Sequence, residues 1–109
     1  MVLYELLCIT KADLKIKSLR ELAKTSGSTI INKGGIIRGF EDWGNLILPK
    51  KKKKHQQIHH EGRHWTMLFD SNPQAQLEIN KILRLDPRVI NYSIIKLGSK
   101  LHEISEKSN

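Results

Sequence analysis

The order of apolar patterns along the chain is the feature that most constrains its fold. Four segments rich in β-branched and other apolar residues predict strands, at about residues 3–9, 36–48, 63–69 and 89–97. Apolar residues recur every three or four positions between about residues 14 and 32, and again after residue 73, and this spacing predicts two helices. The resulting order, βαββαβ, predicts an α+β, ferredoxin-like fold: a four-stranded antiparallel sheet with two helices on one face.

Local signals indicate where these elements begin, bend and end. Residues 71–73, Ser-Asn-Pro, place a capping side chain before a proline at the first helical position. Asp86 and Pro87 are expected to end that helix. Gly27 costs the first helix about 1 kcal/mol relative to alanine, and we expect a bend near Gly44 in the second strand.

A sheet covered by helices on one face and by water on the other should alternate apolar and polar residues. The first and last strands do not. Leu3, Leu7 and Ile9 oppose Tyr4, Leu6 and Cys8 in the first strand, and Val89, Ile95 and Leu97 oppose Ile90, Tyr92 and Ile94 in the last. We therefore expect a partner to cover the helix-free face, since a large exposed apolar patch is a liability.

Five consecutive lysines follow the second strand: Lys50, Lys51, Lys52, Lys53 and Lys54. The chain carries a net charge of +8, and residues 50–64 hold six basic side chains against one acid, so the basicity is local. Pro49 is expected to end the strand because it lacks a ladder donor, and residues 49–62 to form a basic hairpin loop. Such a run stays solvated unless a polyanion neutralises it. We interpret the lysines and Arg63 as contacts to nucleic-acid phosphate, with a solvated surface loop as the alternative.

Histidines also gather on the predicted hairpin. His55 and His59, and likewise His60 and His64, have the spacing of metal ligands on a helix. No carboxylate or thiol cluster completes a shell, and the neighbouring lysines repel a cation, so we expect no metal site. Partly protonated imidazoles beside phosphate are the interpretation we favour.

Trp43 and Trp65 lie on the two strands of the same predicted hairpin. Aromatic side chains on a sheet stack on unpaired bases in RNA-recognition modules. The clustered aromatic pattern of those modules is missing here, which favours burial against a protein partner or in the core. Arg38 suits either a phosphate or an acid such as Glu5, and the sequence leaves that choice open.

Enzymatic and membrane functions find little support in the sequence. There is no Gly-x-Ser-x-Gly motif, and Glu41 and Asp42 are adjacent in a strand and so face opposite sides. We expect no catalytic residues, no small-molecule substrate and no cofactor. Cys8 lies in an apolar run and is expected to be buried. No segment approaches the roughly 20 apolar residues of a membrane span. Because a predicted strand starts at residue 3, we expect no cleavable presequence.

The chain length predicts a single domain over residues 1–98, followed by a polar tail at 99–109. Four motifs run along this domain: Met1-x-x-Tyr4-Glu5-Leu6, Gly34-Gly35-x-Ile37, Glu41-Asp42-Trp43-Gly44 with a Leu48-Pro49-Lys50 exit, and Asp86-Pro87-Arg88-Val89-Ile90. Their order and spacing resemble the family of small-ribosomal-subunit protein six over about residues 2–97. The lysine-rich hairpin and the run at residues 67–70 resemble mitochondrial members, particularly fungal ones, more than bacterial ones.

The resemblance implies a structural constituent of the small ribosomal subunit, in the mitochondrial matrix, with a bacterial-type cytoplasm as the alternative location. Such proteins pair with small-subunit protein eighteen and bind the central domain of small-subunit rRNA in the platform, among other small-subunit ribosomal proteins. A free-standing ferredoxin-like RNA-binding or regulatory module is the alternative function. On this basis the rRNA contacts are expected at Lys50 to Lys54 and Arg63. The partner contacts are expected at Tyr4, Arg38, Phe40, Trp43, Trp65 and Tyr92.

Overall fold

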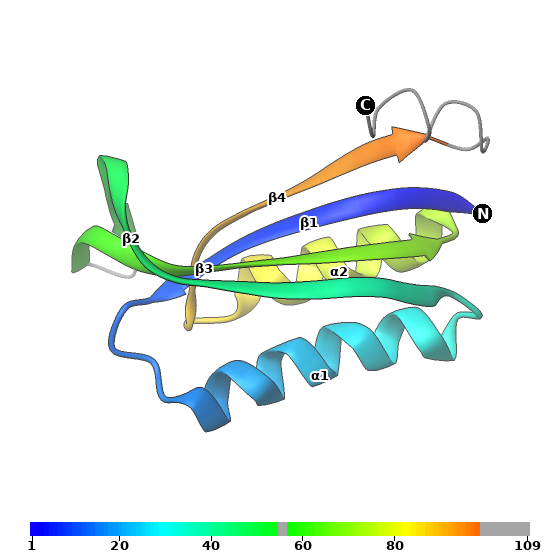
Figure 1. Ribbon diagram of the computed structural model, residues 1–109, viewed down its shortest axis with the longest axis horizontal. Helices are drawn as coiled ribbons and strands as arrows, with labels where there is room; N and C mark the ends of the chain where they lie inside the picture. Colours follow the sequence, from blue (N-terminus) through cyan, green and yellow to red (C-terminus); the bar gives the residue numbers. More distant parts are fainter. Residues whose placement is uncertain (55–56, 99–109) are drawn as a thin grey trace.

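Four strands form one antiparallel sheet, and both helices lie on the same face of it (Figure 1). The computed structural model describes residues 1–54 and 57–98. In chain order the elements are β1 (Val2–Lys11), α1 (Ile16–Asn32), β2 (Ile36–Lys54), β3 (Gln57–Ser71), α2 (Pro73–Leu85) and β4 (Val89–Gly98). The strands lie in the order β2-β3-β1-β4. The predicted ferredoxin-like fold is therefore confirmed.

The core lies between the two helices and one face of the two central strands. Alternate residues of β1 pair with alternate residues of β3 on this face: Tyr4 with Phe69, Leu6 with Met67 and Cys8 with Trp65, all of them buried. The helices contribute Leu19, Leu22, Ile30, Ile79 and Leu83. The predicted burial of Cys8 is confirmed, and desolvation raises the pKa of its thiol far above the usual range. This cysteine is an inert packing residue.

The sequence signals for the helices have direct structural counterparts. Asn72 caps α2, since its side-chain oxygen accepts a hydrogen bond from the backbone N–H of Ala75 at 2.8 Å. Gly27 lies where α1 approaches β2. A Cβ atom at this position would lie 2.9 Å from Cδ1 of Ile37. The glycine that weakens α1 thus permits its close approach to the sheet.

The basic hairpin is built from strands and not from a loop. β2 continues through Pro49 to Lys54 and β3 starts at Gln57, so the predicted loop over residues 49–62 is wrong. The pairing of β2 with β3 shifts between Ile47 and Lys52. Pro49 falls in this unpaired stretch, where its missing N–H removes no ladder bond. The predicted tail at 99–109 lies outside the described residues.

A shift in pairing places two residues of β4 on other faces of the sheet than the sequence predicts. Ile9 pairs with Asn91 and Thr10 with Val89, so the register changes by one residue between these pairs. A bulge of this kind reverses the alternation of side chains beyond it. Val89 consequently joins the core beside the helices, while Ile90 lies near Ile9. The faces predicted for Val89 and Ile90 were wrong for this reason.

The helix-free face is covered in part by the chain itself. The end of the β2–β3 hairpin curls toward this face, away from the helices (Figure 1). Leu48 and Pro49 line a groove of about 460 Å³ together with Ile9 and Ile90, both of which are buried. Farther from the hairpin end the face remains open, with Ile36, Trp43 and Ile95 each about half exposed.

Candidate nucleic-acid and partner interfaces

The last five residues of β2, which we call the lysine strand (residues 50–54), project from the body of the domain. Lys50 to Lys53 are exposed and Lys54 is half-buried. Lys52 pairs with His59 and Lys54 with Gln57, so these two lysines share one face of the ribbon and Lys53 takes the other. None of the five forms an ion pair with a carboxylate in the part of the chain that the structure describes. The exposed ammonium groups of Lys50 to Lys53 are available for an external anion, whereas Lys54 lies near the Asp86 carboxyl and contributes to the lowering of its pKa.

Arg63, the sixth predicted phosphate contact, already has a carboxylate partner. Its Nη2 lies 2.5 Å from Oδ2 of Asp42, and its Nε lies 3.2 Å from both carboxylate oxygens. The hydrogen bonds raise the pKa of the Arg63 guanidinium and lower the pKa of the Asp42 carboxyl. A phosphate would have to compete with Asp42 for the guanidinium of Arg63, which Asp42 holds by charge-assisted hydrogen bonds. Contact of Arg63 with rRNA stays a prediction.

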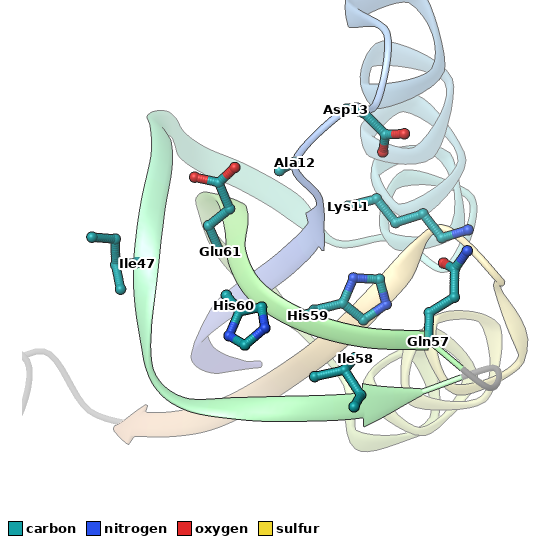
Figure 2. Close-up of a pocket in the computed structure, with 9 residues that line it drawn as sticks. All are labelled: Lys11, Ala12, Asp13, Ile47, Gln57, Ile58, His59, His60 and Glu61. Atoms are coloured by element: carbon teal, nitrogen blue, oxygen red, sulfur yellow. The ribbon is translucent and has the colours of Figure 1, made fainter.

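The hairpin histidines that the structure describes, His59, His60 and His64, form no metal-binding group. His59 and His60 line a hollow of about 710 Å³ beside Lys11 and Asp13, and their rings are drawn in Figure 2. The Nδ1 of His64 lies 3.0 Å from the carbonyl oxygen of Gly62. Within residues 1–54 and 57–98, no three His, Cys, Asp or Glu side chains come together as a metal site would require. His55 lies outside the described residues, and contact of the imidazoles with phosphate stays a prediction.

Three of the predicted partner residues face the helices. Tyr4 and Trp65 are buried in the core, and the Tyr4 ring lies 5.6 Å from that of Phe69. Tyr92 packs against the same core, and its hydroxyl donates a hydrogen bond to the side-chain oxygen of Asn80 in α2. These side chains therefore contribute to the packing of the domain and do not form part of the helix-free face.

Phe40 also lies on the helix side, at the open edge between β2 and α1. Its ring centroid is 5.3 Å from that of Trp65, and 45% of its surface is exposed. With Ile16, Leu19 and Ala23 of α1 it lines a small groove of about 300 Å³. Its ring therefore faces the helices, although at this sheet edge the same residue also borders a hollow of the helix-free face.

The remaining two predicted partner residues, Arg38 and Trp43, do lie on the helix-free face, and bulges place them there. In the pairing of β2 with β3, Ile37 and Gly39 face consecutive residues of β3, and so do Asp42 and Gly44. Arg38 and Trp43 are therefore the extra residues of two bulges, which re-aim side chains. Gly44 supplies the positive φ of 79° at the second bulge.

Hydrogen bonds hold both bulged side chains against the sheet. Nε of Arg38 donates to the carboxylate of Asp70, which answers the question that the sequence left open for this arginine. Nε1 of Trp43 donates to the hydroxyl of Thr66 at 3.3 Å. Trp43 nevertheless remains 57% exposed. It is an ordered aromatic surface on the open part of the helix-free face.

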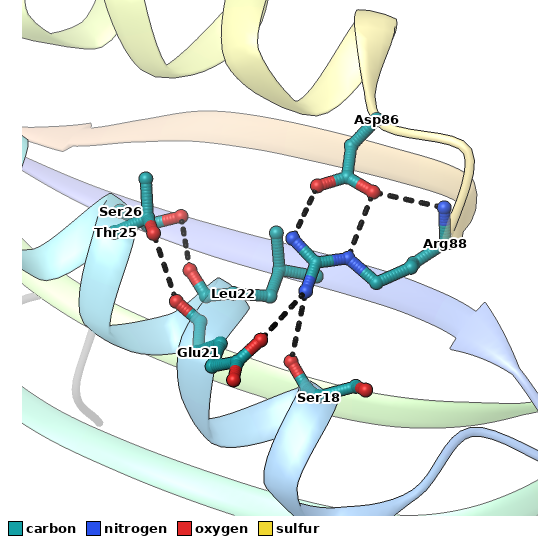
Figure 3. A network of polar contacts seen from close by, with 7 residues as sticks. All are labelled: Ser18, Glu21, Leu22, Thr25, Ser26, Asp86 and Arg88. Atoms are coloured by element: carbon teal, nitrogen blue, oxygen red, sulfur yellow. Dashed lines mark hydrogen bonds and ion pairs between the residues drawn. The ribbon is translucent and has the colours of Figure 1, made fainter.

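A polar network that sequence reasoning had noted only as a family motif joins α1 to the start of β4 (Figure 3). Nη2 of Arg88 lies 2.6 Å from Oδ2 of Asp86, and Nη1 donates to the carbonyl oxygen of Ser18 at 3.2 Å. These bonds lower the pKa of the Asp86 carboxyl and raise that of the Arg88 guanidinium. The Asp-Pro-Arg segment therefore ties the end of α2 and the start of β4 to α1.

Comparison with known proteins identifies the kind of domain that carries these surfaces. A family model described as Ribosomal protein S6 matches residues 3–96. The chain is 35% identical over 105 residues to the small ribosomal subunit protein bS6m of Neurospora crassa, covering 95% of this chain and 89% of that protein. The chain belongs to the ribosomal protein S6 family. The resemblance that the motifs indicated is confirmed.

Other S6 relatives fit the same assignment. The bS6m protein of Drosophila melanogaster is 32% identical over 86% of this chain, which spans 63% of that protein's length. The bS6 protein of Caldanaerobacter subterraneus is 30% identical, with 85% of this chain and 94% of that protein covered. The crystal structure of the 30S ribosomal protein S6 from Thermotoga maritima shares the fold, with a TM-score of 0.78 and 18% identity. The match covers 98% of this chain and 94% of that one.

Membership in the S6 family makes the chain a structural ribosomal protein and not an enzyme. Within the described residues, no helix is long and apolar enough to cross a membrane. A structural protein of this family acts through its binding surfaces. The two candidate surfaces are the lysine strand and the open part of the helix-free face.

Proposed function

We propose that the chain is a structural constituent of the small subunit of a mitochondrial ribosome, where it binds small-subunit rRNA and a neighbouring ribosomal protein. The observation that carries this proposal is the 35% identity to the bS6m protein of Neurospora crassa over almost the whole of both chains. The 32% identity to the Drosophila bS6m protein supports the mitochondrial assignment. Binding outside the ribosome has no comparable support.

We assign the rRNA contact to the lysine strand. Its five ammonium groups lie at the end of the β2–β3 ribbon and form no ion pair with a carboxylate in the described part of the chain. Such groups bind phosphates by releasing condensed counterions, which gives affinity without sequence preference. The lysine strand would therefore position the protein on the rRNA rather than select a sequence.

We assign the protein contact to the open part of the helix-free face, and the partner that the family resemblance implies is small-subunit protein eighteen. Ile36, Trp43 and Ile95 expose 48%, 57% and 52% of their surfaces there. Half-exposed large apolar side chains on one sheet face are typical of a surface that another protein covers. Trp43 is the central candidate because aromatic residues dominate interface energetics.

Sedimentation tests this function directly. A tagged chain expressed in a eukaryotic host with its own mitochondria should migrate with the small ribosomal subunit in a high-salt gradient, because the protein contact persists where phosphate contacts are screened. A variant with all five lysines of residues 50–54 changed to serine should show reduced recovery with the subunit in a low-salt gradient, where phosphate contacts are not screened. If the unmodified chain stays at the top of the gradient at both low and high salt, the proposal is wrong.

A further inference from the structure

The two bulges of β2 and one glycine build a hollow on the helix-free face, which we call the Trp43 hollow. It measures about 540 Å³. Its lining includes two aromatic residues, Phe40 and Trp43, together with an aliphatic side chain and three charged groups. Trp43, Leu68, Thr66, Glu5, Glu41 and Arg38 are among the residues that line it.

The floor of the hollow exists because Gly39 has no side chain. Gly39 pairs with Leu68, and Leu68 pairs with Glu5, so the three residues form one row across β2, β3 and β1. A Cβ atom built on Gly39 would meet nothing within 4 Å. The space above the Leu68 side chain is thus open for a guest group and can be filled without a backbone clash.

The wall of the hollow is the indole of Trp43. The second bulge turns this side chain onto the helix-free face, and its Nε1 donates a hydrogen bond to the hydroxyl of Thr66 at 3.3 Å, which favours one orientation of the ring. A fixed and half-exposed indole face attracts cations through its quadrupole, and arginine stacks on it most readily. The geometry thereby presents an ordered aromatic platform beside an apolar floor.

The charge of the hollow is opposite to that of the protein. Glu5 and Glu41 line it, and neither forms an ion pair among the residues that the structure describes. The one cationic group, Arg38, is matched by the carboxylate of Asp70. In a chain with a net charge of +8, this leaves a locally acidic and aromatic recess. Such a recess repels phosphate and favours a cationic guest.

We propose that the Trp43 hollow receives an arginine side chain from a basic protein segment docked on the helix-free face. The guanidinium stacks on the indole of Trp43 and donates hydrogen bonds to the carboxylates of Glu5 and Glu41, while its methylene stem covers Leu68. This inference rests on the proposed protein contact at this face and specifies its chemistry. It also separates the two interfaces by charge, with rRNA on the lysine strand and a basic protein on the acidic recess.

A peptide titration of the isolated chain tests this proposal. The probe is a short blocked peptide with one arginine between glycines, and its control replaces arginine with citrulline, which has nearly the same shape but no charge. The indole N–H signals of Trp43 and Trp65 are followed by NMR at low salt and assigned with Trp43→Phe. We expect the arginine peptide to shift the Trp43 signal alone, because Trp65 is fully buried. Loss of the charge should weaken binding of the citrulline peptide at least about fivefold.

Variants of the chain complete the test. E5Q combined with E41Q should weaken arginine-peptide binding by about fivefold, and Gly39→Val should abolish it by filling the space above Leu68 while leaving the thermal unfolding midpoint unchanged within a few degrees. Glu78→Gln, which alters an acid that pairs with Lys33 elsewhere, is the matched control and should bind as the unmodified chain does.

Equal binding of the citrulline peptide, or unchanged binding by the double glutamine variant, would overturn the proposal. So would a larger Trp43 shift with a single-stranded RNA oligonucleotide than with the arginine peptide, because the ring would then act as a base-stacking platform. Each result is independent of sedimentation with the ribosomal subunit. The hollow can therefore fail as an arginine site while the proposed ribosomal function stands, and the reverse also holds.

Discussion

The pairing of the lysine strand predicts that its charges do not act equally on RNA. Lys52 and Lys54 share one face of the β2–β3 ribbon, about 7 Å apart along the strand, and Lys53 points to the other face. An RNA strand lying on one face therefore meets either two of these lysines or one. Each neutralised phosphate contributes about 0.7 to 0.9 to the slope of log affinity against log salt concentration. Changing both Lys52 and Lys54 to serine should reduce that slope by about 1.5 if RNA lies on their face.

Affinity for a small-subunit rRNA central-domain fragment, measured by filter binding across a series of salt concentrations, gives the slopes. If RNA lies on the face of Lys52 and Lys54, Lys53→Ser should change the slope by less than about 0.3. The free energy of unfolding should be unchanged in Lys53→Ser, whose side chain is exposed, and should fall only slightly in the double variant, where the half-buried Lys54 is removed. Equal loss per lysine on the two faces would refute the strand geometry as the basis of recognition. Unchanged slopes in both variants would exclude residues 52–54 as phosphate contacts.

Three further outcomes follow from the contacts described above. Arg88→Ala should lower the free energy of unfolding by about 2 kcal/mol in urea denaturation, because it leaves the half-buried Asp86 carboxylate without its donor, whereas the exposed Arg84→Ala should have little effect. Since hydrogen bonds from Arg88 lower the pKa of Asp86, the stabilisation by this carboxylate is complete above about pH 4 and is lost as the pH falls through the lower folded-state value. The unmodified chain should therefore exceed Asp86→Asn in free energy of unfolding by less as the pH falls. A difference that grows on acidification would contradict the role assigned to the Asp86 carboxylate. Trp43→Ser should weaken binding of a purified small-subunit protein eighteen at least about tenfold with normal RNA affinity, while a retained affinity in pull-down titrations would exclude Trp43 from the interface.

Sequence reasoning identified the two candidate surfaces but not all the residues that form them. Lys50 to Lys54 could be recognised because a run of like charges has no place in a core. Tyr4 and Trp65 were expected at a partner surface, yet they pack under the helices. The sequence could not show this, because a strand with apolar residues on both faces does not indicate which face lies under the helices. Glu5 and Gly39 of the Trp43 hollow lie 34 positions apart and become neighbours only through the pairing of each with Leu68. The Gly at position 39 was the available signal, since a glycine inside a strand often marks a close approach or an open space.

The sequence by itself determined the order of the elements, the ends of α2, the burial of Cys8 and the position of the excess positive charge. These follow from local propensity, hydrophobic spacing and charge repulsion, which act over a few residues. Only the tertiary structure decided which face Arg38, Trp43, Val89 and Ile90 occupy, and that the chain remains a strand beyond Pro49. The physical reason is that side chains alternate with a period of two along a strand. A bulge of one residue therefore reverses every face beyond it, and the bulge depends on pairing with residues far away in the chain.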